Sequence, residues 1–292
     1  MRENLEQILR ELPQLDEECI AEYIDEAVEI LKNEKAFIER DNSLITFIGD
    51  IHGDFETTKA IIDQFLGGGI LVFLGDYIDR EPMEWGALYT ITYLVILKTL
   101  YPRDIILLKG NHECNYIIPC YPYEFKWEII QRFGSPELHE KFVELFSHLP
   151  VVFKGNNIIA AHGGILKNGS IDTLRKLDKN DASALVDLVW SDPALSPVDR
   201  GIGEKFNEND LKTFLRNTES TLFIRGHDYH LLGISIYGDR CLTIFSSQRY
   251  MNMGNGGILV AQSKGKISSI DELLVKDYSS GKWVDYRVRR MR

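Results

Sequence analysis

Short hydrophobic runs alternate with amphipathic segments along most of the chain. Runs with the length and branched side chains of buried strands occupy residues 44–48, 70–74, 105–108, 157–161, 222–224 and 241–246. Helical patterns occupy residues 57–66 and 84–100 between the first of these runs. Strands that alternate with helices usually pair in parallel, so the pattern predicts an α/β fold.

The two ends of the chain have different patterns. Residues 1–40 predict two amphipathic helices separated at Pro13, and we expect this N-terminal helical segment to pack on the body of the protein. Residues 258–261 and 266–270 predict a hairpin around Ser-Lys-Gly. The expected organisation is therefore a helical segment (1–40), one main domain (41–275) and a basic, solvated C-terminal tail (276–292).

Composition narrows the classes of partner. The formal net charge of −11 argues against a nucleic-acid-binding protein, and no apolar run approaches a membrane span. The four cysteines form no C-x-x-C pair, which argues against a structural zinc site. With no apparent signal peptide, we expect reduced thiols and a cytoplasmic location.

Polar motifs follow the predicted strands. They are Gly-Asp-Ile-His-Gly-Asp (49–54), Gly-Asp-Tyr-Ile-Asp-Arg (75–80), Gly-Asn-His-Glu (110–113), His-Gly-Gly (162–164) and Arg-Gly-His (225–227). Each fragment alone is more often a turn or a helix cap than a ligand pair. However, ligands of open α/β sheets bind beyond the carboxyl ends of strands, where all of these motifs are expected. The ordered set therefore predicts two metals that act on a phosphate ester.

The donors divide between the two predicted metals. In an extended segment residues i and i+2 point the same way, so Asp50 and His52 can face one metal. Asp76 can bridge both metals, and Asn111, His162 and His227 would complete the second. This donor set suits Mn, Fe, Zn, Co or Ni better than Ca. Two metals roughly 3.5–4 Å apart can clamp a phosphate and generate hydroxide between them, so no covalent enzyme intermediate is needed.

Further residues suit the remaining chemical tasks. His112 follows Asn111 and could protonate the departing alcohol oxygen, while Asp79 could hold its imidazolium form. The planar guanidinium groups of Arg80 and Arg200 match phosphate oxygens and would supply positive charge within an acidic protein. Of the histidines outside the motifs, we expect His139 and His148 to be surface or packing residues on helices.

These motifs resemble those of the phosphoprotein phosphatase family of serine/threonine phosphatases, over residues 44–262. Residues 188–193 (Leu-Val-Trp-Ser-Asp-Pro), 199–201 and 245–250 (Phe-Ser-Ser-Gln-Arg-Tyr) resemble its protein phosphatase 1/2A-like branch. The resemblance implies a metallophosphoesterase fold, a central β-sandwich of two mixed sheets flanked by helices, with the active site at strand carboxyl ends. The resemblance assigns the metal ligands, the His112–Asp79 acid pair and the two phosphate-binding arginines to the same residues as above. It also places Tyr250 and Tyr121 in the substrate cleft.

The sequence also departs from that pattern. Glu81 replaces the usual Gly, Lys109 the usual Arg, and the segment 115–123 lacks an Arg often found there. The overhanging loop has Gln248, Arg249 and Met251, and methionine cannot supply the thiol that some cyclic peptide toxins alkylate. None of these positions is a predicted ligand, so the departures concern substrate preference and toxin sensitivity. The short helical N-terminus and the lack of a eukaryotic tail favour a prokaryotic member.

The leading hypothesis is hydrolysis of phosphoserine and phosphothreonine in proteins by direct attack of a hydroxide that bridges two divalent metals, with phosphotyrosine as a further substrate. Manganese is expected to support activity in vitro. Phosphorylated proteins are the expected partners, without nucleic acid or membrane, and the sequence names no regulatory subunit. The alternatives are a diadenosine tetraphosphate hydrolase and a non-catalytic phosphopeptide-binding module. The Trp-Ser-Asp-Pro segment argues against the first, and intact His112 and Asp79 argue against the second.

Overall fold

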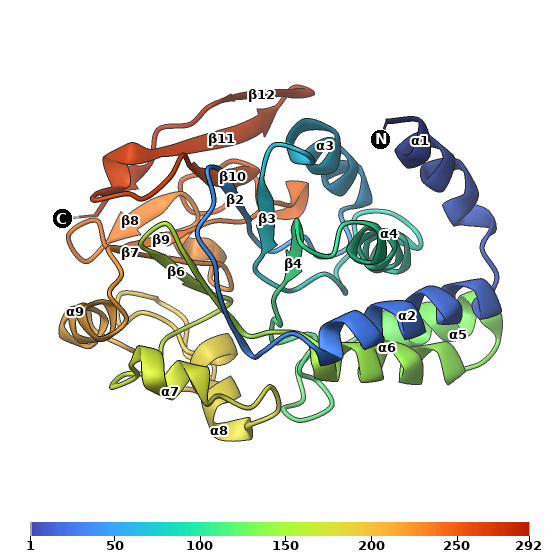
Figure 1. Cartoon of the computed structure of the whole chain (residues 1–292), viewed down its shortest axis with the longest axis horizontal. Coiled ribbons are helices and arrows are strands. Elements are labelled where there is room, and N and C mark those ends of the chain that lie inside the picture. Colours follow the sequence, from blue (N-terminus) through green and yellow to red (C-terminus); the bar gives the residue numbers. More distant parts are fainter. Residues whose placement is uncertain (1, 292) are drawn as a thin grey trace.

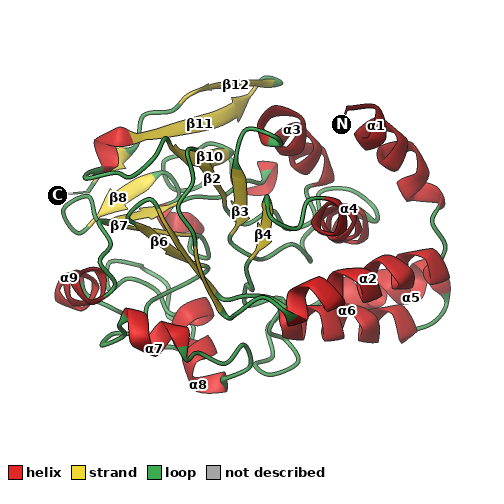
Figure 2. Ribbon diagram, viewed as in Figure 1, coloured by secondary structure: helices red, strands yellow, loops and turns green. Residues whose placement is uncertain are grey.

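The computed structural model describes residues 2–291 and contains two mixed β-sheets packed face to face, with helices on both outer sides (Figures 1 and 2). The strand order of the seven-stranded sheet is β1 (Phe37–Glu39), β5 (Val152–Gly155), β6 (Ile158–Ala161), β7 (Leu222–Arg225), β9 (Cys241–Thr243), β8 (Ile234–Ile236) and β13 (Arg289–Arg290). The order of the six-stranded sheet is β12 (Lys282–Asp285), β11 (Leu273–Ser279), β10 (Leu259–Ser263), β2 (Ile45–Ile48), β3 (Ile70–Phe73) and β4 (Ile105–Leu107).

Parallel pairing brings the important strand ends to one edge of each sheet. Strands β2, β3 and β4 pair in parallel in the six-stranded sheet. Strands β6, β7 and β9 do so in the seven-stranded sheet. The carboxyl ends of these strands therefore open on a common side, as the alternation of strands and helices in the sequence predicts.

The core between the sheets explains why the strand sequences are almost continuously apolar. Phe47 on β2 and Val72 on β3 point between the sheets, where Phe47 meets Phe153 of β5 with a ring-centroid distance of 6.0 Å. Their neighbours Ile48 and Leu71 point outward into a second cluster beneath the helices. Both faces of each central strand are thus buried. Each fully buried side chain of this size contributes about 1.5–3 kcal/mol to folding.

Two groups of helices cover the outer faces. The six-stranded sheet and its neighbourhood are covered by α1 (Arg2–Glu11), α2 (Glu17–Lys32), α3 (Phe55–Phe65), α4 (Gly86–Leu100), α5 (Phe125–Phe133) and α6 (Glu137–His148). The seven-stranded sheet is covered by α7 (Ile171–Arg175), α8 (Ala182–Leu185) and α9 (Glu208–Asn217). In the part of the chain that the structure describes, no helix combines the length and apolarity needed to cross a bilayer.

Three details differ from the sequence-based expectations. The predicted helical segment 1–40 also contains β1, a three-residue strand too short to show a period. Strand β10 pairs with β11, so the second strand of the predicted hairpin begins at Leu273, beyond the expected residues 266–270. The segment 276–292, expected as a solvated tail, contains the end of β11, all of β12, and β13, which pairs with β8.

Candidate active site

The predicted ligands meet where strands of both sheets end. Asp50, Asp76 and Asn111 follow β2, β3 and β4 of the six-stranded sheet, and all three are buried. His162 and His227 follow β6 and β7 of the seven-stranded sheet and are also buried. The site therefore spans the seam between the two sheets.

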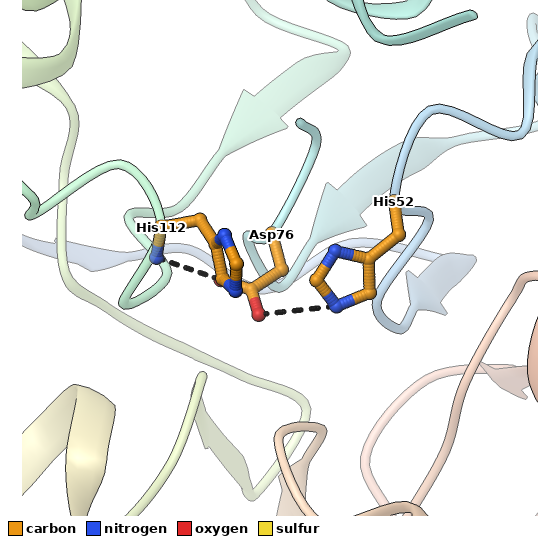
Figure 3. A group of neighbouring side chains, drawn as sticks. All are labelled: His52, Asp76 and His112. Carbon is orange, nitrogen blue, oxygen red and sulfur yellow. Dashed lines mark hydrogen bonds and ion pairs between the residues drawn. The ribbon is translucent and has the colours of Figure 1, made fainter. Parts of the chain in front are cut away.

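Asp76 lies at the centre of this group. Its Oδ2 atom is 3.4 Å from Nε2 of His52 and also 3.4 Å from Nε2 of His162. Its Oδ1 atom accepts a hydrogen bond from the backbone N–H of His112 at 3.1 Å. Figure 3 shows His52 and His112 on opposite sides of this carboxylate. One carboxylate oxygen thus faces both histidine-containing halves of the site, which is the placement expected of a bridging ligand.

Backbone carbonyls orient the three predicted histidine ligands. Nδ1 of His52 lies 3.0 Å from the carbonyl oxygen of Ile78, and Nδ1 of His162 lies 3.1 Å from that of Leu74. Nε2 of His227 lies 3.2 Å from the carbonyl oxygen of Trp190. A carbonyl only accepts hydrogen bonds, so in each ring this nitrogen carries a proton, and in the neutral form of the ring the other nitrogen presents a lone pair to the site. Metal-binding histidines are commonly held in this way.

The ring nitrogens of His162 and His227 that face the site point toward one another, and a bound cation would stabilise this arrangement. Nε2 of His162 lies 3.2 Å from Nδ1 of His227 and 3.0 Å from Oδ1 of Asn111. Two lone pairs at this separation repel unless a cation lies between them. Among the described residues, two groups have ligand atoms within 4.8 Å of one another around Asp76: His52, Asp76 and His112, and Asp76, His162 and His227. A third group, Asp79, His112 and Cys120, was not anticipated. The donor set fits divalent transition metals.

The charge states of the cluster distinguish His162 from the other two predicted histidine ligands. Burial opposes its charged form, but Asp76 and Asp50 raise the pKa of His162 above the ordinary value, so a bound cation would replace a proton on that ring. Burial lowers the pKa of His52 and of His227 well below the ordinary value, so both rings are neutral, the form that binds metal. Burial, opposed by His162, raises the pKa of Asp50 to about 7. Burial opposes ionisation of Asp76 too, but His162 and His112 hold its pKa well below the ordinary value. Two buried carboxylates are difficult to ionise together, and bound cations would remove that cost.

Asp50 and His52 approach each other across a turn and not along an extended segment. His52 has φ 46°, so the segment is a turn and the expected extended i, i+2 arrangement is wrong. The two side chains nevertheless approach, with 3.9 Å between Oδ2 of Asp50 and Nε2 of His52. Both oxygens of Asp50 also accept the N–H of His227 at 3.1 Å, which links the two sheets.

Backbone strain is concentrated here. His52, Asp76, Asp79, Arg80 and His227 all have φ between 46° and 67°, a left-handed region that residues other than glycine seldom adopt. Each costs on the order of 1–3 kcal/mol and persists only because surrounding contacts fix it. Such strain typically marks a site whose side chains must point in set directions.

His112 differs from the other three histidines in its partner. Its Nδ1 atom lies 2.5 Å from Oδ2 of Asp79, a carboxylate rather than a carbonyl. Its Nε2 atom is buried and has no hydrogen-bond partner among the described residues. Burial alone would lower the pKa of His112, but the charge of Asp76 and the hydrogen bond to Asp79 raise it well above the ordinary value. The ring is therefore held as a proton donor whose free N–H faces the site.

The two predicted arginines lie on opposite sides of the group. Nη1 of Arg80 is 3.2 Å from Nε2 of His52 and donates to the hydroxyl of Tyr250 at 3.1 Å. Arg200 donates to Asp192 at 2.7 Å and to the carbonyl oxygen of His227 at 3.0 Å. Tyr250 is buried against the site, but Tyr121 is 93% exposed, and no hydrogen bond or ring contact joins it to the cluster within residues 2–291.

Several residues with positioning roles were missed in the sequence. Glu113 is fully buried and accepts backbone N–H groups of Asp76, Tyr77 and Gly110 at 2.8, 2.9 and 2.9 Å, so it ties two motif loops together. Its position inside Gly-Asn-His-Glu was the available signal. Asp192, from the Trp-Ser-Asp-Pro segment, holds both Arg200 and the fully buried Arg225 at 2.7 Å.

The departures from the family pattern have structural roles. Gln248 donates to Asp54 through its backbone N–H at 2.7 Å and its side chain at 3.0 Å. Arg249 donates to the carbonyl oxygen of Arg80 at 3.0 Å, so the overhanging loop is fastened to two motifs. Lys109 is fully buried and donates to the hydroxyl of Tyr116 and the carbonyl of Lys179, both at 2.8 Å.

Comparison with known proteins identifies the family. The profile described as calcineurin-like phosphoesterase matches residues 43–231, which include every predicted ligand. The chain belongs to the calcineurin-like phosphoesterase family. A protein phosphatase 2A catalytic subunit from Dictyostelium discoideum is 31% identical over 255 residues, 82% of this chain and 79% of that protein. The serine/threonine-protein phosphatase 4 catalytic subunit of Kluyveromyces lactis is 30% identical over 289 residues, 93% and 88% of the two chains.

Solved structures agree on the fold of this calcineurin-like phosphoesterase. A Saccharomyces cerevisiae protein serine/threonine phosphatase with similarity to human phosphatase PP5 superposes with a TM-score of 0.79, at 21% identity over 94% of this chain and 95% of that one. A cold-active protein tyrosine phosphatase gives 0.61, at 17% identity over 88% and 82%. The predicted two-sheet fold flanked by helices is confirmed.

Proposed function

We propose that this calcineurin-like phosphoesterase hydrolyses phosphoserine and phosphothreonine in protein substrates. The observation that carries the proposal is the position of Asp76. One of its oxygens faces both histidine-containing halves of the site, next to a buried imidazole, His112, whose Nε2 has no partner among the described residues. The relatives named as protein phosphatase 2A and 4 catalytic subunits support phosphoproteins as the substrate class.

The same residues would hold two divalent ions. Asp50, His52 and Asp76 suit the first, and Asp76, Asn111, His162 and His227 suit the second. When bound, such ions lower the pKa of a water and polarise the phosphoryl group, which makes direct hydrolysis feasible at neutral pH. We propose manganese for activity in vitro, while iron, zinc, cobalt and nickel also fit these donors.

The remaining residues act on the phosphate and the leaving group. Arg80 and Arg200 would bind non-bridging phosphate oxygens, and Arg80 is oriented for this by its hydrogen bond to Tyr250. His112 would donate the proton on Nε2 to the departing serine or threonine oxygen. Asp79 keeps that ring oriented, because its other oxygen accepts the backbone N–H groups of Glu124 and Phe125 at 2.7 Å each.

The test combines metal analysis with a substrate panel. Purified protein would be analysed for bound metals, loaded with manganese, and assayed on phosphoserine, phosphothreonine and phosphotyrosine peptides and on diadenosine tetraphosphate. We expect phosphopeptide turnover that His112→Asn greatly reduces. Turnover of the dinucleotide with none of the phosphopeptides would overturn the proposal. An absence of any phosphoester hydrolysis, with phosphopeptide binding retained, would instead indicate a binding module.

Two expectations from the sequence extend this proposal. A cytoplasmic location accords with four free cysteines, three of which are buried. Phosphorylated proteins would be the partners, and no observation on the described residues identifies a regulatory subunit.

A further inference from the structure

A cavity of about 340 Å³ lies behind the Asp79–Arg80 loop, between the starts of α4 and α5. Its lining includes four carboxylates and two indole rings, from Glu81, Glu84, Trp85, Glu124, Trp127 and Glu128. We call it the Glu–Trp cavity. Glu81 directly follows Arg80, and the backbone N–H of Glu124 donates to Asp79. The cavity and the phosphate-binding residues therefore share one loop.

The backbone makes room for Glu81 at this position. A side chain at Gly53 would collide with the Cβ atom of Glu81, and one at Gly86 would collide with the carbonyl oxygen of Gly53 and crowd the same Cβ atom. Gly53 has φ 65°, which also disfavours other residues.

The carboxylates of the Glu–Trp cavity have no cationic partner. Within residues 2–291, none of the four forms an ion pair within 4.0 Å. Arg249 acts on Glu81 only through its charge, while its own side chain donates to the carbonyl oxygen of Arg80. Arg132 lies over the Trp85 ring, 5.8 Å from its centroid, and donates to the carbonyl oxygen of Pro13.

Glu128 has a buried carboxyl oxygen without a hydrogen-bond partner beside the Glu–Trp cavity. Its side chain is buried, with 7% of the residue exposed, and its Oε1 accepts the N–H of Leu88 at 3.1 Å. Its Oε2 has no partner among the described residues, and neither does the buried Oε2 of Glu81. Burial, reinforced by the charge of Glu81, raises the pKa of Glu128 to about 8, so the carboxyl is mostly neutral near pH 7 and a cation placed beside it would favour its ionised form. Buried oxygens without partners are rare because leaving them unpaired is costly.

The dimensions favour an organic cation over a metal ion. The described residues contain no group of three ligand atoms within 4.8 Å of one another in this cavity. The volume is that of a small ligand site. Trp127 is 66% exposed, so its indole ring is accessible to a cation.

We propose that the Glu–Trp cavity binds the guanidinium or ammonium group of an Arg or Lys side chain in the phosphorylated substrate. This inference rests on the proposed phosphatase function, and it makes the substrate class a phosphoprotein with a basic residue near the phosphorylated one. The proton stays on the basic side chain, and no covalent step is involved.

The test uses pairs of phosphoserine peptides that differ only by Arg or Gln at successive positions on both sides of the phosphoserine. With manganese-loaded protein, we expect the Arg peptide to have kcat/KM on the order of tenfold higher at one or two positions. The preference should fall toward equality in Glu84→Gln/Glu124→Gln and in Trp127→Ala, three positions with exposed side chains. Glu26→Gln is the matched control, because Glu26 is an exposed glutamate on α2 that does not line the cavity.

Binding of the same peptides to manganese-loaded His112→Asn protein, measured by calorimetry, separates the two proposals. Equal affinity and equal kcat/KM for Arg and Gln peptides at every position would overturn the basic-residue subsite and leave the phosphatase function standing. Hydrolysis of none of the peptides would overturn the function, and the affinity difference would still decide the subsite. If circular dichroism shows that the double variant is misfolded, Trp127→Ala alone tests the basic-residue subsite.

Discussion

Nδ1 of His112 lies 2.5 Å from Oδ2 of Asp79, and both side chains are completely buried. This contact distinguishes the proposed acid from the proposed ligands, whose outer nitrogens face neutral carbonyl groups. A carboxylate partner stabilises the imidazolium, whereas a carbonyl only fixes the tautomer of a neutral ring. In the proposed mechanism, the same residue type therefore serves for proton donation in one place and for metal binding in the others.

The substitution His112→Asn should separate proton donation from metal binding. Turnover of a phosphoserine peptide should fall by about 10²–10⁴-fold, because the departing oxygen loses its proton donor. Metal content, measured by atomic emission, should stay near that of the wild type. If the variant lost its metals instead, His112 would have to be regarded as a ligand.

Asp76→Asn should have the opposite signature. An amide keeps the shape of the side chain but removes the charge that faces both halves of the site. We expect the purified variant to lose most of its bound metal together with its activity. Retention of both metals with loss of activity alone would contradict a bridging role.

Arg80 and Tyr250 should act as a coupled pair. Arg80→Ala should lower kcat/KM by about 10²–10³-fold if its guanidinium stabilises charge on the phosphate. Tyr250→Phe removes only the hydroxyl that orients Arg80 and should cost roughly fivefold. In a double-mutant cycle the second substitution should add little once Arg80 is gone. Strictly additive effects would argue that Tyr250 does not act through Arg80.

Glu113 should matter for stability as well as for the site. Glu113→Ala leaves three buried backbone N–H groups without an acceptor, and we expect the free energy of unfolding to fall by about 3–5 kcal/mol. Urea denaturation of metal-free protein measures this without a contribution from lost metal. Glu113→Gln, which keeps one acceptor oxygen, should cost less. If Glu113→Ala lowered the free energy of unfolding by less than the exposed control Glu26→Gln, the stabilising role of Glu113 would be refuted.

His139 should give the folded protein a defined sensitivity to acid. Burial lowers its pKa to about 4 from 6.5, and its Nε2 lies 2.8 Å from the hydroxyl of Tyr123. Between these pKa values the unfolded chain binds a proton that the folded chain does not. The contribution of this group to stability is therefore complete above pH 6.5 and is lost progressively as pH falls toward 4.

His139→Gln should make the free energy of unfolding less dependent on pH in that window. Urea denaturation at several pH values would measure the slope for both proteins. Identical slopes would show that the titration lies elsewhere.

The sequence predicts the two-sheet fold and the meeting of the ligands because both depend on strand ends, which short apolar runs mark well. It does not predict that His52 and Arg80 occupy left-handed conformations, since such strain is fixed by distant contacts. The role of Glu113 was missed for a similar reason, because its partners are backbone N–H groups of another loop. Strand β13 was missed because two arginines give no hydrophobic signal, and the strand forms through pairing with β8 and through ion pairs of Arg290 with Asp239 and Asp271.

The seam between the sheets also has a mechanical consequence. Asp50, Asp76 and Asn111 are attached to strand ends of one sheet, while His162 and His227 are attached to strand ends of the other. Side chains such as Phe47 and Phe153, which fill the space between the sheets, therefore act as a spacer that sets the alignment of the two halves. Interior residues that never touch the substrate thus help determine how well the catalytic groups are matched, and the core serves as the frame of the active site as well as the source of its stability.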